Sequence, residues 1–293
     1  MESFGLNKIE LPNGETYAYR EAGSGDKTLL LIHGNMSSSL FYDTLVSHLK
    51  DFVRVIAVDL RGFGHSTYNK NCEDLGDWAD DINLFLSELK IEKVSVMGWS
   101  TGGGISLKLA SKYPEKTEKV ILMSSVGIKG IKIPLEGIEK PTLKDLQEKF
   151  TYGQFVETSM KNGDAATIGV GFKRSVYTSG RFPEPEKFDA YMKEVCLQRN
   201  FIEVVYRLMT FNISEESNNL VEGTGEIKKI KNEILILHGD ADKVVLKEEA
   251  EGYAKAFGAQ ATLKILPDCD HSPLTFDVEA VSKAVLEFLG AKQ

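Results

Sequence analysis

The stretch VSVMGWSTGGGISLKLA, residues 94–110, decides the fold class. It begins with a short apolar run typical of a buried strand, passes through a Gly-rich turn and continues with apolar residues at helical spacing. The turn matches the pattern Gly-x-Ser-x-Gly, with Ser100 at its centre. A serine on a sharp strand-to-helix turn projects from the carboxyl end of the sheet, where open α/β folds bind ligands. Ser100 is therefore a candidate nucleophile; the alternative is a Gly-rich turn that only connects two elements.

Strand-like and helix-like stretches alternate on both sides of this turn. Apolar runs typical of buried strands lie at residues 29–32, 53–58, 94–97, 120–123, 234–237 and, more weakly, 262–266. A hairpin is predicted around Asn13-Gly14. Apolar residues recur at helical spacing in residues 78–86, 105–110 and 278–288. The alternation predicts the α/β class, with a mostly parallel, eight-stranded sheet and helices on both faces.

The alternation stops between residues 127 and 230. Helices are predicted there at 143–150, 186–198 and 200–211, separated by glycines and prolines. We therefore expect a core formed by residues 1–126 and 231–293, with residues 127–230 inserted as a helical cap. The stretch from Asn162 to Pro185 is the best candidate for a mobile lid. Aromatic residues that can line an apolar pocket or pack the cap helices are Phe150, Phe155, Phe172, Tyr177, Phe201, Tyr206 and Phe211.

The composition favours a globular protein that acts on small molecules. Hydrophobic residues make up 42% and charged residues 27% of the 293 residues. The net charge of −8 argues against nucleic acid or an anionic membrane surface as a partner. Cys72, Cys196 and Cys269 match no disulfide or zinc pattern, so we expect a reducing, cytoplasmic setting and no metal site. We expect no secretory signal and no membrane span. We also expect no cofactor, since dinucleotide and Walker motifs are missing.

A serine hydroxyl needs an adjacent base, and the sequence contains five histidines. His33 and His238 each end a buried strand and precede a glycine, which favours a scaffold role. His48 lies in a predicted helix, and His65 lies in a Gly-rich turn. His271 lies in a polar loop after the last predicted strand, from which it can reach the carboxyl edge of the sheet. His271 is therefore the candidate base, with an exposed loop residue as the alternative.

The loop after residues 234–237 offers two acids, Asp240 and Asp242. A buried carboxylate that accepts the second N–H of the base fixes its tautomer and stabilises the imidazolium. The residues alone leave both candidates open, and the aspartate that is not used would form a turn.

Two backbone N–H groups are candidates for an oxyanion hole, which stabilises the negative charge that develops in the transition state. One belongs to Thr101, at the start of the helix after Ser100. The other belongs to Asn35, in the loop after His33-Gly34. The side chain of Asn35 can satisfy nearby backbone groups at the same time.

Together these segments resemble the α/β-hydrolase superfamily, in its esterase, lipase and C–C hydrolase branch. Residues 33–35, HGN, resemble the oxyanion segment of the family, and residues 59–66, DLRGFGHS, resemble its Asp-x-Arg-Gly-x-Gly-x-Ser turn. Residues 238–242, HGDAD, resemble its acid loop, which assigns the acid to Asp242. The resemblance implies an α/β-hydrolase fold and a triad of a serine, a histidine and Asp242.

Two shorter likenesses concern the substrate. Residues 33–38 resemble haloalkane dehalogenases, which carry an aspartate where this chain has Ser100, so dehalogenation and epoxide opening are not expected. Residues 98–103 are similar to small intracellular polyhydroxybutyrate depolymerases. The prediction is a serine hydrolase that cleaves small esters or oligoesters through an acyl-enzyme. The alternatives are a polyhydroxyalkanoate depolymerase, a C–C bond hydrolase or hydroxynitrile-lyase-type enzyme, and a small-ligand receptor with a hydrolase fold.

Overall fold

The computed structural model describes residues 4–291 and contains a mixed sheet of eight strands, in the order β1-β2-β4-β3-β5-β6-β7-β8. β1 pairs antiparallel with β2, and β2 pairs antiparallel with β4. The other neighbouring strands are parallel. The mostly parallel sheet and the α/β class are confirmed. The strands are β1 Leu6–Glu10, β2 Thr16–Ala22, β3 Thr28–Ile32, β4 Arg54–Val58, β5 Val94–Trp99, β6 Thr117–Met123, β7 Glu233–Gly239 and β8 Ala261–Leu266.

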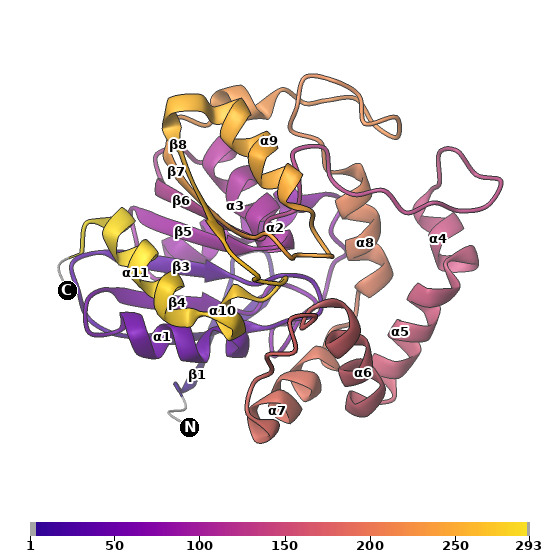
Figure 1. Cartoon of the computed structure of the whole chain (residues 1–293), viewed down its shortest axis with the longest axis horizontal. Helices are drawn as coiled ribbons and strands as arrows, with labels where there is room; N and C mark the ends of the chain where they lie inside the picture. Colours follow the sequence, from indigo (N-terminus) through magenta and orange to yellow (C-terminus); the bar gives the residue numbers. More distant parts are fainter. Residues whose placement is uncertain (1–3, 292–293) are drawn as a thin grey trace.

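Helices cover both faces of this sheet (Figure 1). On one face α2, α3 and α9 contribute buried residues such as Trp78, Ile105 and Tyr253. On the other face α1 and α11 contribute residues such as Leu45 and Val285. The two faces therefore hold two apolar clusters with the sheet between them. The helices of the core are α1 Asp43–Leu49, α2 Leu75–Glu88, α3 Thr101–Lys112, α9 Lys247–Phe257, α10 Pro273–Phe276 and α11 Val278–Leu289.

β3 shows why a central strand can be apolar on both of its faces. Successive side chains of a strand point to opposite faces of the sheet. Leu30 and Ile32 belong to one apolar cluster, and Leu29 and Leu31 belong to the other. All four side chains are fully buried. A continuous apolar run is therefore the sequence pattern of a strand covered by helices on both faces.

Between β6 and β7 the chain forms helices and no strand of the sheet. Figure 1 shows these helices grouped beside the sheet, on the side away from the two termini. Helices were expected where α4, α7 and α8 lie, but not where α5 and α6 lie. The five helices are α4 Leu143–Lys149, α5 Thr151–Lys161, α6 Ala165–Ser175, α7 Pro185–Val195 and α8 Phe201–Thr210.

The α6 helix lies within the stretch that the sequence favoured as a lid. Its first turn is capped by Asp164, whose side chain accepts a hydrogen bond from the N–H of Thr167 at 3.0 Å. Ile168 and Phe172 of α6 are buried in the apolar cluster that also contains α1 and α11. Glycines lower helix propensity, which is why no helix was predicted, but burial of this apolar face outweighs that preference.

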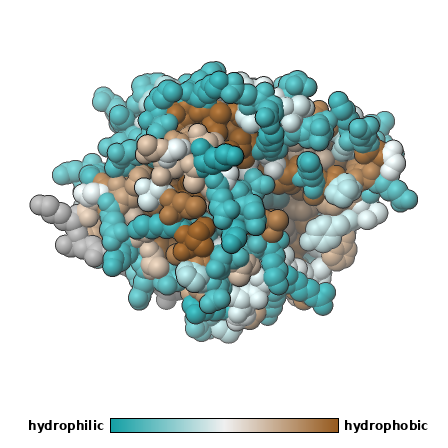
Figure 2. Space-filling model, turned by 45° about the horizontal axis from the view of Figure 1, so that its top comes forward, coloured by the Kyte–Doolittle hydropathy of each residue, from teal (hydrophilic) through white to brown (hydrophobic). Residues whose placement is uncertain are grey.

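The molecular surface is mixed. In Figure 2 the apolar patches, drawn in brown, are separated by hydrophilic residues drawn in teal. Exposed large apolar side chains include Tyr152 and Phe155 of α5 and Val170 of α6. Within residues 4–291 no helix has both the length and the apolar character needed to cross a membrane.

Candidate active site

Ser100 lies between β5 and α3 in a strained backbone conformation. Its φ is 54° and its ψ is −116°, a region that residues with side chains rarely adopt. The surrounding structure holds this conformation on both sides. The N–H of Ser100 donates to the carbonyl of Met123 at 3.0 Å, and its own carbonyl accepts from the N–H of Val126 at 3.1 Å.

Two glycines make this turn possible because the backbone approaches itself closely there. A Cβ on Gly98 would lie 2.1 Å from the carbonyl oxygen of Gly102. A Cβ on Gly102 would lie 2.0 Å from the carbonyl oxygen of Ile32, on β3. Both distances are far below van der Waals contact, so any larger residue would displace the turn that carries Ser100.

His271 and Asp242 form a buried hydrogen-bonded pair. His271 Nδ1 lies 2.7 Å from Asp242 Oδ2, and each residue is only 4% exposed. Asp242 Oδ1 accepts from the N–H groups of Val244 at 2.8 Å and Val245 at 2.9 Å. Burial raises the pKa of Asp242, but the charge and hydrogen bond of His271 and the two N–H donors outweigh it and lower the pKa below its ordinary value. The ionised carboxylate therefore accepts a hydrogen bond from Nδ1–H, so that in the neutral imidazole Nε2 carries no hydrogen.

The loop that carries His271 is fixed from two directions. Trp99, beside Ser100, donates its indole N–H to the carbonyl of His271 at 2.9 Å. Asp270 accepts from the N–H of Ser179 at 3.0 Å and from its hydroxyl at 2.6 Å. Asp270 is buried and attaches the histidine loop to the segment between α6 and α7. No sequence pattern singles out Asp270, since its partner lies 91 residues away.

Asp240, the other candidate acid, has a different environment. It is exposed, and its Oδ1 accepts a hydrogen bond from the N–H of Asp268 at 2.7 Å. This contact links two loops at the end of β7 and β8. The geometry is that of a turn-stabilising aspartate.

Ser100 and His271 line the same cavity, which has a volume of about 370 Å³. Asn35 and Thr101 line it too, so four of the five predicted site residues meet there, and Asp242 lies directly behind His271. Ser100 Oγ and His271 Nε2 form no hydrogen bond with any residue in 4–291, which leaves both atoms available to a bound molecule. The catalytic roles of these residues stay predictions.

The predicted oxyanion donors flank Ser100. Gly34 packs against it so closely that a Cβ on Gly34 would lie 3.0 Å from Ser100 Cβ and 3.7 Å from Oγ. The next N–H along the chain is that of Asn35. On the other side, Thr101 is the first residue of α3, where helix N–H groups have no partner within the helix. Neither N–H donates to an acceptor in the part of the chain that the structure describes.

The histidines that end β3 and β7 have structural roles. His33 Nδ1 lies 2.7 Å from the carbonyl of Gly34, and its Nε2 accepts from the N–H of Leu60 at 3.1 Å. His238 Nε2 donates to the carbonyl of Val245 at 2.8 Å. Burial lowers the pKa of both histidines, which keeps them neutral. Among residues 4–291 no three His, Cys, Asp or Glu side chains are grouped to hold a metal ion.

The helices between β6 and β7 supply much of the cavity wall. Of the aromatic residues that the sequence singled out there, Phe150, Phe172 and Phe201 line the cavity. Phe155 lines a neighbouring cavity of about 450 Å³. Tyr177, Tyr206 and Phe211 line neither and pack within the apolar clusters.

The neighbouring cavity meets the one at Ser100 along a common wall. Met36, Tyr152, Gly171 and Ser175 line both. Most of its lining comes from α5 and α6. A chain-like group that leaves the Ser100 cavity therefore meets a second apolar space between these two helices.

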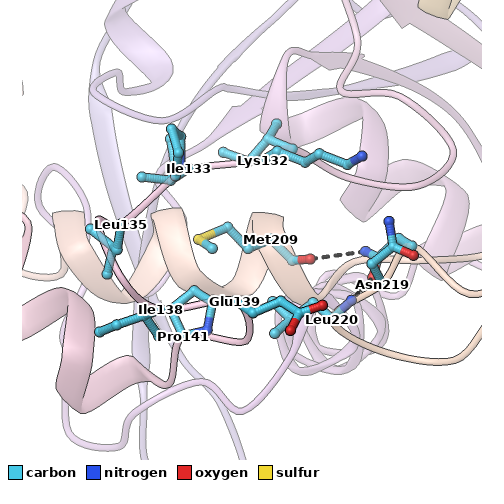
Figure 3. A pocket seen from close by; sticks show the side chains of 12 residues that line it. Lys132, Ile133, Leu135, Ile138, Glu139, Pro141, Met209, Asn219 and Leu220 are labelled. Carbon is cyan, nitrogen blue, oxygen red and sulfur yellow. Dashed lines mark hydrogen bonds between the residues drawn. The ribbon is translucent and has the colours of Figure 1, made fainter.

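A larger cavity of about 610 Å³ adjoins the Ser100 cavity, and the two share the lining residues Ile131, Lys132 and Ile133. Figure 3 shows Met209 of α8 in its middle, with the segment from Ile133 to Pro141 curved around it. Its lining contains neither serine nor histidine. The smaller cavity is therefore the candidate active site, although it is not the largest.

Comparisons with known proteins identify the family of the chain. The family model described as serine aminopeptidase, S33, matches residues 23–279. A bifunctional esterase/perhydrolase of Acinetobacter calcoaceticus is 26% identical over 292 residues, covering 97% of this chain and 99% of that protein. A 2-hydroxymuconate semialdehyde hydrolase of a Pseudomonas species is 24% identical, covering 83% of this chain and 80% of that protein.

Other similarities are partial or concern the fold alone. An uncharacterized protein of Mycobacterium tuberculosis is 34% identical over 116 residues, which is 40% of this chain and about a third (34%) of that protein. The solved structure of a thermophilic esterase from Thermogutta terrifontis matches with a TM-score of 0.75 at 22% identity, covering 98% of both chains. This structural match supports the α/β-hydrolase fold.

Proposed function

Because this chain belongs to the serine aminopeptidase S33 family of α/β hydrolases, we propose that it hydrolyses carboxylic esters through an acyl-enzyme formed on Ser100. One observation carries the proposal. A strained serine and a histidine held by a buried carboxylate line the same mostly apolar cavity. Relatives that match over nearly their whole length include an esterase, which supports ester cleavage.

The proposed reaction assigns one task to each group. Ser100 Oγ attacks the ester carbonyl carbon while its proton passes to His271 Nε2. The N–H groups of Asn35 and Thr101 donate to the oxyanion. The tetrahedral intermediate then releases the alcohol, which takes the proton from His271. Water repeats the sequence on the acyl-enzyme, releasing the acid and restoring Ser100.

The cavity lining favours esters over the free N-terminus of a peptide. The ammonium group of such a substrate needs a nearby carboxylate, because an unpaired buried charge is costly. None of the residues that line the cavity, all within the described chain, is Asp or Glu. Lys132 and His271 are the residues there that can carry positive charge, and the remaining lining is mostly apolar. Uncharged or anionic esters fit this lining.

C–C bond hydrolysis by the same residues is the second candidate. It is favoured by the similarity to 2-hydroxymuconate semialdehyde hydrolase, which extends over 80% of that protein. Parallel assays with p-nitrophenyl esters and with a 2-hydroxy-6-oxo-diene acid separate the two reactions. A higher kcat/KM for the dienoic acid would assign the chain to C–C cleavage. Release of no more than one p-nitrophenol per protein molecule, without further turnover, would favour a ligand receptor.

Between about pH 5 and pH 8 the activity is expected to rise with pH, because the base must be neutral to accept the proton of Ser100. Asp242, whose pKa is lowered, is already ionised there, so it does not cause the rise. Burial lowers the pKa of His33 and His238, so these histidines titrate at lower pH. The check is a pH profile of kcat/KM for a p-nitrophenyl ester. A flat profile across this range, with chemistry limiting the rate, would argue against His271 as the base.

Substitutions in the cavity wall are expected to change the preferred acyl chain. Tyr152 lies between the Ser100 cavity and the cavity between α5 and α6. Tyr152→Ala should join the two spaces and raise the kcat/KM ratio of long to short p-nitrophenyl esters about tenfold, the discrimination of one or two methylenes. Tyr206→Ala removes a ring of the same size from α8 that lines neither cavity, so it serves as the matched control.

Each chain-length series should include a polyester film, because a depolymerase would act on it and a small-molecule esterase would not. An unchanged ratio in Tyr152→Ala, with Ser100 still reactive toward a fluorophosphonate, would mean that residues 127–230 do not select the substrate. A shift of the ratio would support our proposal that these residues act as a cap.

A further inference from the structure

The segment between α7 and α8 inserts one amide side chain into the loop that follows β3. Gln198 is 4% exposed, and its Oε1 accepts a hydrogen bond from the N–H of Met36 at 2.9 Å. Its Nε2 donates to Asn35 Oδ1 at 2.7 Å. The two residues that it contacts line the Ser100 cavity. Gln198 itself does not line that cavity.

The orientation of this amide follows from its partners. The N–H of Met36 is a donor, so the group facing it must be the carbonyl oxygen of Gln198. The amide nitrogen then points at Asn35 Oδ1 and also lies 3.2 Å from Asn200 Oδ1. Both ends of the Gln198 amide are therefore satisfied in only one orientation.

The loop held by Gln198 needs support from outside. Met36 has a φ of 55°, in the left-handed region that is unfavourable for a residue with a side chain. The hydroxyls of Ser37 and Ser39 are buried and have no hydrogen-bond partner within residues 4–291. The core supplies one external hydrogen bond, from the N–H of Ser39 to Asp59 Oδ1 at 2.7 Å. Gln198 supplies the contacts at Asn35 and Met36, the residues that follow Gly34.

We propose that Gln198 is a positioning residue that holds the N–H of Asn35 in place for the oxyanion. Gly34 packs against Ser100, and the N–H of Asn35 is the next one along the chain. Gln198 holds both the side chain of Asn35 and the backbone of Met36, on either side of the Asn35–Met36 peptide bond. An oxyanion donor must lie about 2.7–3.1 Å from the developing charge, so a small shift of this loop weakens it. The inference rests on the proposed function.

The adjacent Arg199 provides a matched control. Its backbone N–H donates to the carbonyl of Gly62 at 2.9 Å, and its guanidinium donates to the carbonyls of Gly64 and Ser66. Arg199 thus attaches the same segment to the core without touching the loop at Asn35. Arg199→Ala is expected to lower stability and to leave kcat close to the parent value.

Gln198→Ala is expected to lower kcat for p-nitrophenyl esters about tenfold and to leave KM nearly unchanged. Direct loss of one oxyanion donor costs about 10²–10³ in kcat, and misplacement costs less. The inhibition constant of a trifluoromethyl ketone, whose adduct with serine carries an oxyanion, should rise by the same factor. A purely structural role would not move these two quantities together.

A double-mutant cycle tests the pathway through Asn35. Asn35→Ala keeps the backbone N–H but removes the acceptor that Gln198 binds, so it should lower kcat by a similar factor. The double variant should be no slower than the slower single variant, because both changes release the same N–H. If Gln198→Ala fails to fold, Gln198→Glu takes its place in the test. This variant keeps the shape of the side chain but places an oxygen against Asn35 Oδ1, so it should also lower kcat.

An unchanged kcat in folded Gln198→Ala would overturn the inference, and so would fully additive losses in the double variant. These outcomes are distinguishable from failure of the proposed function. If the parent protein neither hydrolyses esters nor reacts at Ser100 with a fluorophosphonate, the proposed function fails. If the parent does both and the Gln198 variants keep the kcat of the parent, this inference fails and the proposed function stands.

Discussion

Ser100→Ala is expected to lower kcat for p-nitrophenyl esters by about 10⁶-fold, the loss typical of a removed serine nucleophile. Alanine keeps the Cβ, so the strained backbone with φ of 54° and the packing against Gly34 are unchanged. Only the oxygen that attacks the carbonyl is lost. The fold should persist, which thermal unfolding of parent and variant will check.

The matched control is Ser111→Ala. Ser111 lies near the other end of the same helix, α3, and its hydroxyl donates to the carbonyl of Lys108 at 3.0 Å. This variant should keep the parent kcat. Retention of more than about a hundredth of the parent activity in folded Ser100→Ala would remove Ser100 from the role of nucleophile, because the expected loss is about 10⁶-fold.

Asp242→Asn is expected to lower kcat by about 10⁴-fold, the second largest effect. The oxygen of the introduced amide can still accept from the N–H groups of Val244 and Val245, which leaves the NH₂ group of that amide facing His271 Nδ1. Nδ1 must then accept a hydrogen bond, so the proton moves to Nε2. A histidine with hydrogen on Nε2 cannot take the proton of Ser100.

Asp240→Asn provides the comparison for this prediction. Asp240 is exposed and contacts the N–H of Asp268, and the oxygen of an asparagine side chain can still accept this hydrogen bond. Its kcat should stay within a few-fold of the parent, since exposed substitutions away from a site have small effects. Steady-state kinetics of both variants decides the ranking. A larger loss of kcat in Asp240→Asn than in Asp242→Asn would assign the role of the orienting acid to Asp240.

The strands were predictable because burial on both faces leaves a plain pattern. The run from Leu29 to Ile32 contains no polar residue, and each face of β3 contacts its own apolar cluster. The Gly-x-Ser-x-Gly turn was predictable for a similar reason, since the backbone approaches at Gly98 and Gly102 exclude any side chain. Both patterns are local, so a single sequence displays them.

The choice of acid was not predictable from the residues alone. Asp240 and Asp242 lie in the same loop and differ in burial, which depends on how the loops after β7 and β8 meet. The resemblance to the hydrolase family supplied the preference for Asp242. The structure places this carboxylate 2.7 Å from His271 Nδ1, which supports the preference on physical grounds.

The cavity wall and the contacts of Gln198 could not be predicted from the sequence either. No helix was predicted at α5 and α6, because glycines at 153, 163, 169 and 171 interrupt the helical pattern of apolar residues in the sequence. Gln198 contacts residues 162 and 163 positions away in the chain, and a lone glutamine carries no pattern that indicates such a contact. Long-range packing determines these features.

The most direct test of Ser100 as the nucleophile is peptide mass mapping after reaction with a fluorophosphonate. The reagent forms a stable adduct only with a serine activated by an adjacent base. The expected result is one adduct per chain, on the peptide that contains Ser100, with no adduct in Ser100→Ala and strongly slowed labelling in His271→Ala. An adduct on another serine of a protein that turns over esters would contradict the proposed mechanism.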